Sequence, residues 1–175
     1  MRSAIAAALL LVPATALVAQ KPDFSGSWKL NPQMSDSMPM GGARPDGAGG
    51  PGAGRGPGGR GGMGPAGEMF ITQLTSRMMI EQKIGEQSRT MSYHLDGTES
   101  KNPGMMGRDF VTTTVWVENT LVTKGKNTFT TPMGEMTIET NEVRSLSADS
   151  KTMTVVLTTV SPRGTMTRKV VYDKQ

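Results

Sequence analysis

Runs of alternating side chains make up most of this chain after residue 68, and threonine and valine dominate them. The alternation is clearest in residues 109–117, 152–160 and 165–173, where every second position shares one face of an extended chain. Threonine and valine favour this conformation because branching at Cβ restricts their side-chain torsion. Since no stretch shows a sustained helical period, the pattern predicts an all-β fold.

Turn residues such as Asp96-Gly97 and Lys124-Gly125 separate these runs at short intervals. The strands expected on this basis cover residues 24–31, 69–75, 77–84, 87–95, 109–117, 120–126, 128–131, 135–146, 151–160 and 165–173. Turns this short join antiparallel neighbours. The sequence therefore predicts an antiparallel up-and-down meander of about eight to ten strands, closed into a barrel or half-barrel because an open sheet exposes two edges.

The first twenty residues have the features of a secretory signal peptide. Arg2 gives a positive start, residues 4–12 are uninterruptedly apolar, and residues 14–19 offer small side chains to signal peptidase. The apolar run is shorter than the roughly 20 residues that span a bilayer, so we expect cleavage and no transmembrane segment in the mature chain. The absence of cysteine excludes disulfides, thiolate metal sites and a lipid-modified cysteine. Together these features predict export to the periplasm or the cell exterior.

A glycine-rich segment separates the first expected strand from the second. Residues 41–67 are mostly glycine with scattered proline and arginine, and Met63 is their one large apolar residue. Such a segment buries too little surface to offset the backbone entropy of folding, about 1–2 kcal/mol per residue. We therefore expect a disordered insertion over residues 32–67, within a single β domain over residues 21–175.

Three short blocks carry a resemblance to a family. Residues 24–31 read Phe-Ser-Gly-Ser-Trp-Lys-Leu-Asn, and residues 146–155 and 116–122 are similar to a later strand-turn-strand block and to a hairpin. In these blocks the chain resembles exported bacterial lipocalin-like (calycin-like) proteins that open with Phe-Ser-Gly-Thr-Trp-Lys-Leu-Asn. It departs from their pattern at Glu118 and Ser150, where the family has glycine.

The resemblance implies a lipocalin-like barrel and three structural residues. Trp28 would pack across one end of the barrel, and Arg168 would lie over its ring as the stacked cation. Gly26, which has no Cβ, would let a neighbouring group approach closely. These roles are structural, so the resemblance implies no catalytic site.

Catalytic and metal-binding constellations are not visible in the sequence. His94 is the one histidine, and no Gly-x-Ser-x-Gly motif accompanies it. The glutamates at 81, 86, 135, 139 and 142 are expected to form a solvated face rather than a catalytic pair. We therefore predict neither an enzyme nor a cofactor.

Methionine is unusually frequent, with 15 residues in the chain. Met34, Met38 and Met40 cluster in a segment expected to be a loop, and thioethers suit Cu(I). The competing interpretation is that methionine acts as an adaptable apolar filler. We favour the filler role for Met136, Met153 and Met166, which fall on strands.

Two functions remain open from the sequence. One is a binding protein that holds a small apolar molecule or lipid between inward-facing Val, Leu, Met and Thr. The other is a non-enzymatic envelope or structural protein that contacts anionic envelope polymers through its surface and basic Gly-rich loop, given a net charge of +4. Cu(I) handling is a third, weaker hypothesis. Export argues against an intracellular nucleic-acid partner for the Arg-Gly pairs of the loop.

Overall fold

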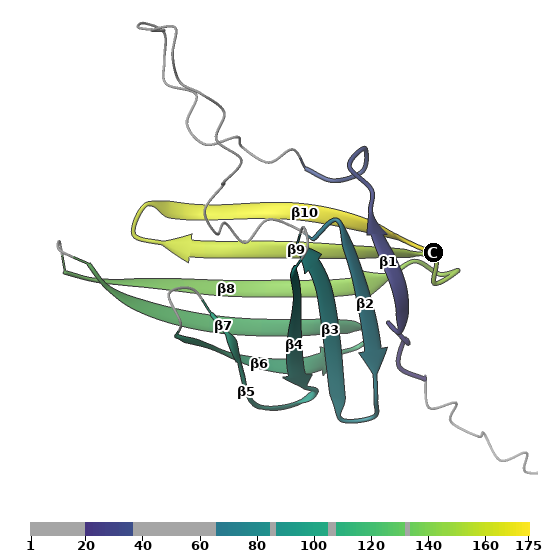
Figure 1. Cartoon of the computed structure of the whole chain (residues 1–175), viewed down its shortest axis with the longest axis horizontal. Coiled ribbons are helices and arrows are strands. Elements are labelled where there is room, and N and C mark those ends of the chain that lie inside the picture. The colour runs from purple at the N-terminus through teal and green to yellow at the C-terminus, as the bar shows by residue number, and fades with distance from the viewer. Residues whose placement is uncertain (1–19, 37–65, 85–86, 105–107, 132–133) are drawn as a thin grey trace, which may run out of the picture.

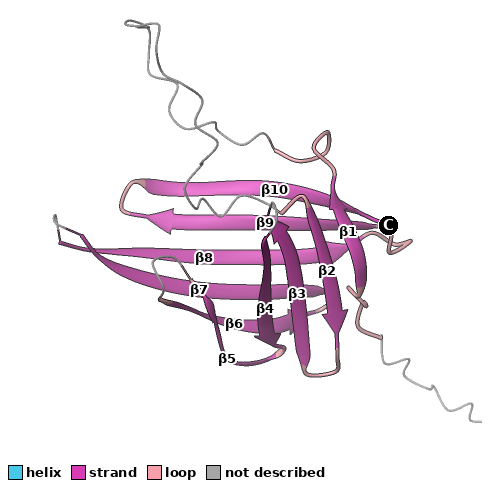
Figure 2. Cartoon of the chain, viewed as in Figure 1, coloured by secondary structure: helices cyan, strands magenta, loops and turns pink. Residues whose placement is uncertain are grey.

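The computed structural model describes residues 20–36, 66–84, 87–104, 108–131 and 134–175, which form ten strands and, within these ranges, no helix (Figures 1 and 2). The strands are β1 (Gly26–Leu30), β2 (Glu68–Gln73), β3 (Arg77–Ile84), β4 (Gln87–His94), β5 (Asp96–Pro103), β6 (Asp109–Val117), β7 (Thr120–Thr131), β8 (Gly134–Leu146), β9 (Thr152–Ser161) and β10 (Gly164–Lys174). The expected all-β fold is confirmed.

One antiparallel sheet contains every strand, in the order β4-β3-β2-β1-β10-β9-β8-β7-β6-β5. Strands that follow one another in sequence are neighbours, and β1 pairs with both β2 and β10, so that the first and last strands meet. The two edges of the sheet, β4 and β5, also lie against each other. The result is the predicted meander, rolled into a nearly closed barrel.

Side chains rather than a backbone ladder join β4 to β5. The Ser92 amide donates to Asn102 Oδ1 at 2.7 Å, and Asn102 Nδ2 donates to the Ser92 carbonyl at 3.0 Å. The His94 amide donates to Ser100 Oγ at 2.8 Å. Because these contacts satisfy the edge of β4, the barrel closes without exposing two unpaired strands.

Two strand assignments from the sequence were wrong. Residues 120–126 and 128–131 form one strand, β7, because β8 pairs with it without interruption along its length. Residues 96–103 were assigned to no strand, yet they form β5. The segment lacks alternating apolar residues because its inward side chains, Ser100 and Asn102, serve the β4 seam instead.

The hydrophobic core fills one end of the barrel. Its buried members come from the segment before β1, from seven of the strands and from the link between β4 and β5: Phe24, Trp28, Met69, Ile71, Met78, Ile80, Tyr93, Leu95, Leu121, Met153, Val155, Val170 and Tyr172. Figure 1 shows β2–β4 crossing this end, near the C-terminus, while the opposite ends of β7–β10 project past them. Along these projecting ends, inward residues such as Phe129, Ile138 and Leu157 are only half-buried.

The start of the predicted insertion is tied to β10. Ser35 Oγ accepts a hydrogen bond from the Val171 amide at 2.9 Å, and Asp36 Oδ2 accepts one from the Lys169 amide at 2.6 Å. Residues 32–36 therefore provide hydrogen-bond acceptors for amides of β10 beyond the end of its pairing with β1. Residues 37–65, which hold most of the expected insertion, lie outside the described residues, as do residues 1–19 of the expected signal peptide.

Candidate functional site

Trp28 lies at the filled end of the barrel. The residue is 1% exposed, and its Nε1 donates to the Phe24 carbonyl at 2.9 Å. A buried indole needs a partner for its one N–H, and the chain bend just before β1 supplies it. Burial of its large ring makes Trp28 a fixed part of the core.

The cation over the Trp28 ring is Lys174, whose Nζ lies 5.3 Å from the ring centroid. Trp28 and Lys174 are direct partners across the β1–β10 ladder, whereas Arg168 lies further along β10, opposite Leu157 of β9. The stacking role expected for Arg168 therefore falls to Lys174. Gly26 has a φ of 130°, and a Cβ there would lie 2.8 Å from Lys174 Cε, so the predicted close approach at this glycine is made by that side chain.

The other residues singled out from the sequence do not form a chemical site. Met34 is 54% exposed, and Met38 and Met40 lie outside the described residues. His94 lies at the end of β4, where its backbone bonds Ser100. Within the described ranges no group of three or more His, Asp or Glu side chains could hold a metal ion. Of the predicted methionine fillers, Met153 is fully buried and Met166 is 51% exposed on the projecting end of β10.

A buried ion pair inside the barrel was not anticipated. Arg144 Nη2 lies 2.5 Å from Glu142 Oε1, and the two side chains are 5% and 23% exposed. Glu142 was grouped with Glu135 and Glu139 on a solvated face, which is wrong for this residue. Positions 135 and 139 share the outer face of β8, whereas position 142 points inward.

Two buried tyrosines, Tyr93 and Tyr172, lie near the ion pair. The Arg144 guanidinium carbon lies 5.5 Å from the centroid of the Tyr93 ring on β4, across the barrel interior. Burial alone would lower the pKa of Arg144, but Glu142 and Tyr93 raise it above its ordinary value, so the guanidinium stays charged. Burial raises the pKa of Tyr93, and it raises that of Tyr172 to about 12, so both phenols stay neutral.

Guanidinium groups outnumber carboxylates on the inner face of the barrel. The cross-strand register places Arg89, Arg144 and Arg168 on this face, with Lys174 at its filled end. Among the described strand residues Glu142 is the one acidic side chain that points inward. Several buried nitrogens lack a hydrogen-bond partner in the described part of the chain: Arg89 Nε, Arg144 Nε, Arg144 Nη1 and Arg168 Nε.

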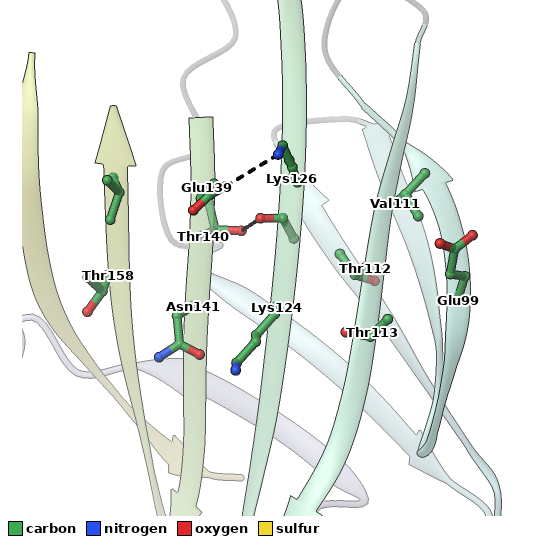
Figure 3. A pocket seen from close by; sticks show the side chains of 12 residues that line it. Glu99, Val111, Thr112, Thr113, Lys124, Lys126, Glu139, Thr140, Asn141 and Thr158 are labelled. Atoms are coloured by element: carbon green, nitrogen blue, oxygen red, sulfur yellow. Dashed lines mark hydrogen bonds and ion pairs between the residues drawn. The ribbon is translucent and has the colours of Figure 1, made fainter. Parts of the chain in front are cut away.

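A groove of about 570 Å³ crosses the outer face of β6–β9 (Figure 3). Figure 3 shows Lys126 joined to Glu139 across the groove, at 3.6 Å between Nζ and Oε1. Both side chains are more than half exposed, so solvent screening leaves this pair little strength. The groove is on the opposite face of the sheet from the core.

Comparison with known proteins assigns no family to the chain. No family model matches the sequence, and no curated protein matches it. Among solved structures, the zebrafish ileal bile acid-binding protein in complex with cholic acid is 15% identical, with a TM-score of 0.47. That match covers 62% of this chain and 72% of the other. Within the described residues, no helix has the length and apolar character needed to cross a bilayer.

Proposed function

We propose that the protein binds a small apolar molecule or lipid at the open end of its barrel interior, and that it does so after export. The observation that carries the proposal is the incomplete burial of the apolar inner face on the projecting ends of β6–β10. The members of this open inner face are Phe110, Phe129, Met136, Ile138, Leu157 and Met166. In water such a surface is unfavourable by about 25 cal/mol per Å², so an apolar guest that covers it gains that energy.

Local packing supports this location. Gly125 of β7 points inward between these residues, and a Cβ there would collide with the Phe110 ring. The ring therefore lies over Gly125 and lines the inner face. Met136 and Met166 add flexible thioether side chains that adjust to different apolar shapes.

Export rests on features of the sequence itself. Residues 1–20 combine a positive start, a short apolar run and small residues, and the chain has no cysteine that would be oxidised outside the cytoplasm. We propose that the mature protein acts in the periplasm or outside the cell. Mass spectrometry of the protein secreted by a producing cell tests this, and a mature chain that still begins at Met1 would contradict it.

Titration with phenylnaphthylamine, a neutral apolar fluorophore, tests the binding function. We expect saturable binding with one site per chain. Leu157→Gln, on the inner face of β9, should weaken it about fivefold or more, because a polar amide replaces an apolar contact. Val156→Gln is the matched control, since its half-buried side chain lies next in sequence on the outer face.

The alternative, an envelope protein that acts through its surface, gives a different outcome. It predicts no saturable uptake of the fluorophore, or equal effects of the inner and outer substitutions. Either result would reject the interior site.

A further inference from the structure

We propose that the ligand of this interior site is an anionic amphiphile, whose acidic group is bound by Arg144 and Arg168 while its apolar part covers the open inner face. The inference rests on the proposed function and adds the chemical class of the ligand. A carboxylate, sulfonate or phosphate ester on an apolar body shares the required chemistry.

Positive charge exceeds negative charge inside the barrel. Arg89, Arg144 and Arg168 point inward from three different strands, and Glu142 is the one carboxylate among the described strand residues that points toward them. Charges removed from water are costly unless they are paired. One carboxylate cannot neutralise three guanidinium groups, so the interior favours a further negative charge.

Several N–H donors of the inward arginines have no hydrogen-bond partner among the described residues. A guanidinium carries five N–H donors in a planar fork. Arg144 points Nη2 at Glu142, and its guanidinium also interacts with the Tyr93 hydroxyl. Its Nε and Nη1 are nonetheless buried and lack a hydrogen-bond partner among the described residues, as does Arg168 Nε. Buried donors without partners are rare in folded proteins. Two parallel N–H groups of one guanidinium match the two oxygens of a carboxylate or phosphate.

These arginines lie between the filled and the open parts of the barrel. In the register, Arg168 lies opposite Leu157, and Leu157 lies opposite Glu142, so one row of the inner face holds all three. Arg144 belongs to the next row toward the core, opposite Val155. Exposure rises along this path, from buried Arg144 to half-buried Glu142 and Arg168.

The same path continues onto apolar surface. Beyond Arg168 the inner face of β10 carries Met166, and the inner faces of β8 and β7 carry Ile138 and Phe129. A ligand whose acidic group reaches the arginines would therefore lay its apolar body over the open inner face. A neutral ligand covers the same surface but leaves the donors unpaired, and a cationic ligand is repelled.

Two fluorophores of nearly the same shape separate this inference from the proposed function. Anilinonaphthalene sulfonate carries one negative charge, and phenylnaphthylamine carries none. We expect the sulfonate to bind the wild-type protein about tenfold or more tightly than the neutral probe, as charge-assisted hydrogen bonds to a buried guanidinium provide. Equal affinities would overturn the inference and leave the proposed function standing, whereas binding of neither probe would overturn both.

Matched variants locate the anion site. Arg168→Met keeps an unbranched apolar side chain but loses the charge, and it should remove most of the preference for the sulfonate, measured as the ratio of the two probes' affinities in each variant. Lys169→Met, which removes the same charge from the exposed outer face of β10, should leave both affinities unchanged. If the two variants weaken sulfonate binding equally, the overall positive charge of β10 accounts for the preference. The assignment of the anion site to Arg168 would then be wrong.

Glu142→Gln gives a prediction of opposite sign. Removing the one inward carboxylate of the described strands frees Arg144 and should tighten sulfonate binding severalfold, with no gain for the neutral probe. Weaker sulfonate binding in this variant, with its fold intact by circular dichroism, would contradict an anion site built on Arg144.

Discussion

Replacing Asn102 with alanine should open the barrel between β4 and β5. The Asn102 amide accepts a hydrogen bond from the Ser92 amide at 2.7 Å and donates one to the Ser92 carbonyl at 3.0 Å. The residue is 3% exposed, so its end of these part-buried bonds is shielded from water. No backbone ladder joins β4 to β5 in the described residues. When the Asn102 side-chain amide is removed, the backbone N–H and carbonyl of Ser92 therefore lose their hydrogen-bond partners.

The expected loss follows from these two bonds. Each contributes about 0.5–1.5 kcal/mol net, and stranding a buried donor or acceptor costs about 1–3 kcal/mol. Ser92 is half-buried, which lets water compensate in part. We therefore expect Asn102→Ala to lower the free energy of unfolding by about 2–3 kcal/mol, a large share of the roughly 5–15 kcal/mol of a typical domain.

Urea denaturation and amide hydrogen exchange measure this effect. Exchange of the Ser92 amide should accelerate in Asn102→Ala more than exchange at the β8–β9 ladder. Asn141→Ala serves as control because Asn141 Oδ1 has no hydrogen-bond partner in the described part of the chain, and it should change stability by less than about 0.5 kcal/mol. The reasoning is refuted if both variants are equally stable, or if Ser92 keeps its protection.

Three further predictions concern the frame of the barrel. Glu118→Gly and Ser150→Gly should each raise the free energy of unfolding by about 0.5–1 kcal/mol in urea melts. The φ values of 51° and 56° strain a residue with a side chain, and relief of this strain exceeds the entropy that glycine loses on folding. Lower stability of both variants would contradict this. Gly26→Ala should lose about 1–3 kcal/mol by the same assay, since its φ of 130° and the 2.8 Å approach to Lys174 Cε disfavour a side chain; a neutral effect would count against it. Burial raises the pKa of Tyr172 to about 12 in the folded protein. The neutral phenol therefore adds about 2–3 kcal/mol less to the free energy of unfolding as pH rises from 10 to 12. Tyr172→Phe should flatten this alkaline decline in stability.

The strand pattern was predictable where residues alternate between apolar and polar, and not where a strand serves a neighbour with polar side chains. β9 and β10 followed directly from their alternation. β5 did not, because its inward residues Ser100 and Asn102 are polar, and their value depends on the backbone of β4. Ser100 and Asn102 are short polar residues two positions apart, which is compatible with one face of a strand. That spacing identifies their partners only once β4 and β5 are placed side by side.

The positions of the two strained turn residues were visible as departures from the family pattern. Glu118 and Ser150 stand where the resemblance expects glycine, and among the described residues they are the two non-glycine positions with positive φ. Both residues therefore adopt a positive φ that glycine would adopt with less strain.

The inner face of β8 could not be oriented from its sequence. Around Glu142, Val143 and Arg144, simple hydrophobic patterning would point Val143 inward and the two charges outward. The structure has the reverse arrangement, because Arg144 pairs with Glu142 and packs against Tyr93, which is distant in sequence. The contact of Lys174 with Trp28 could not be predicted for a similar reason, since the register that places the two residues side by side is a property of the closed sheet.

The location of bound ligand tests the central claim most directly. Methyl resonances of Ile138 and Leu157 report on the open inner face, and those of Val115 and Val160 report on the exposed outer face. On titration with anilinonaphthalene sulfonate, we predict saturable shifts at Ile138 and Leu157 with little change at Val115 and Val160. Shifts confined to the outer valines would contradict an interior binding site.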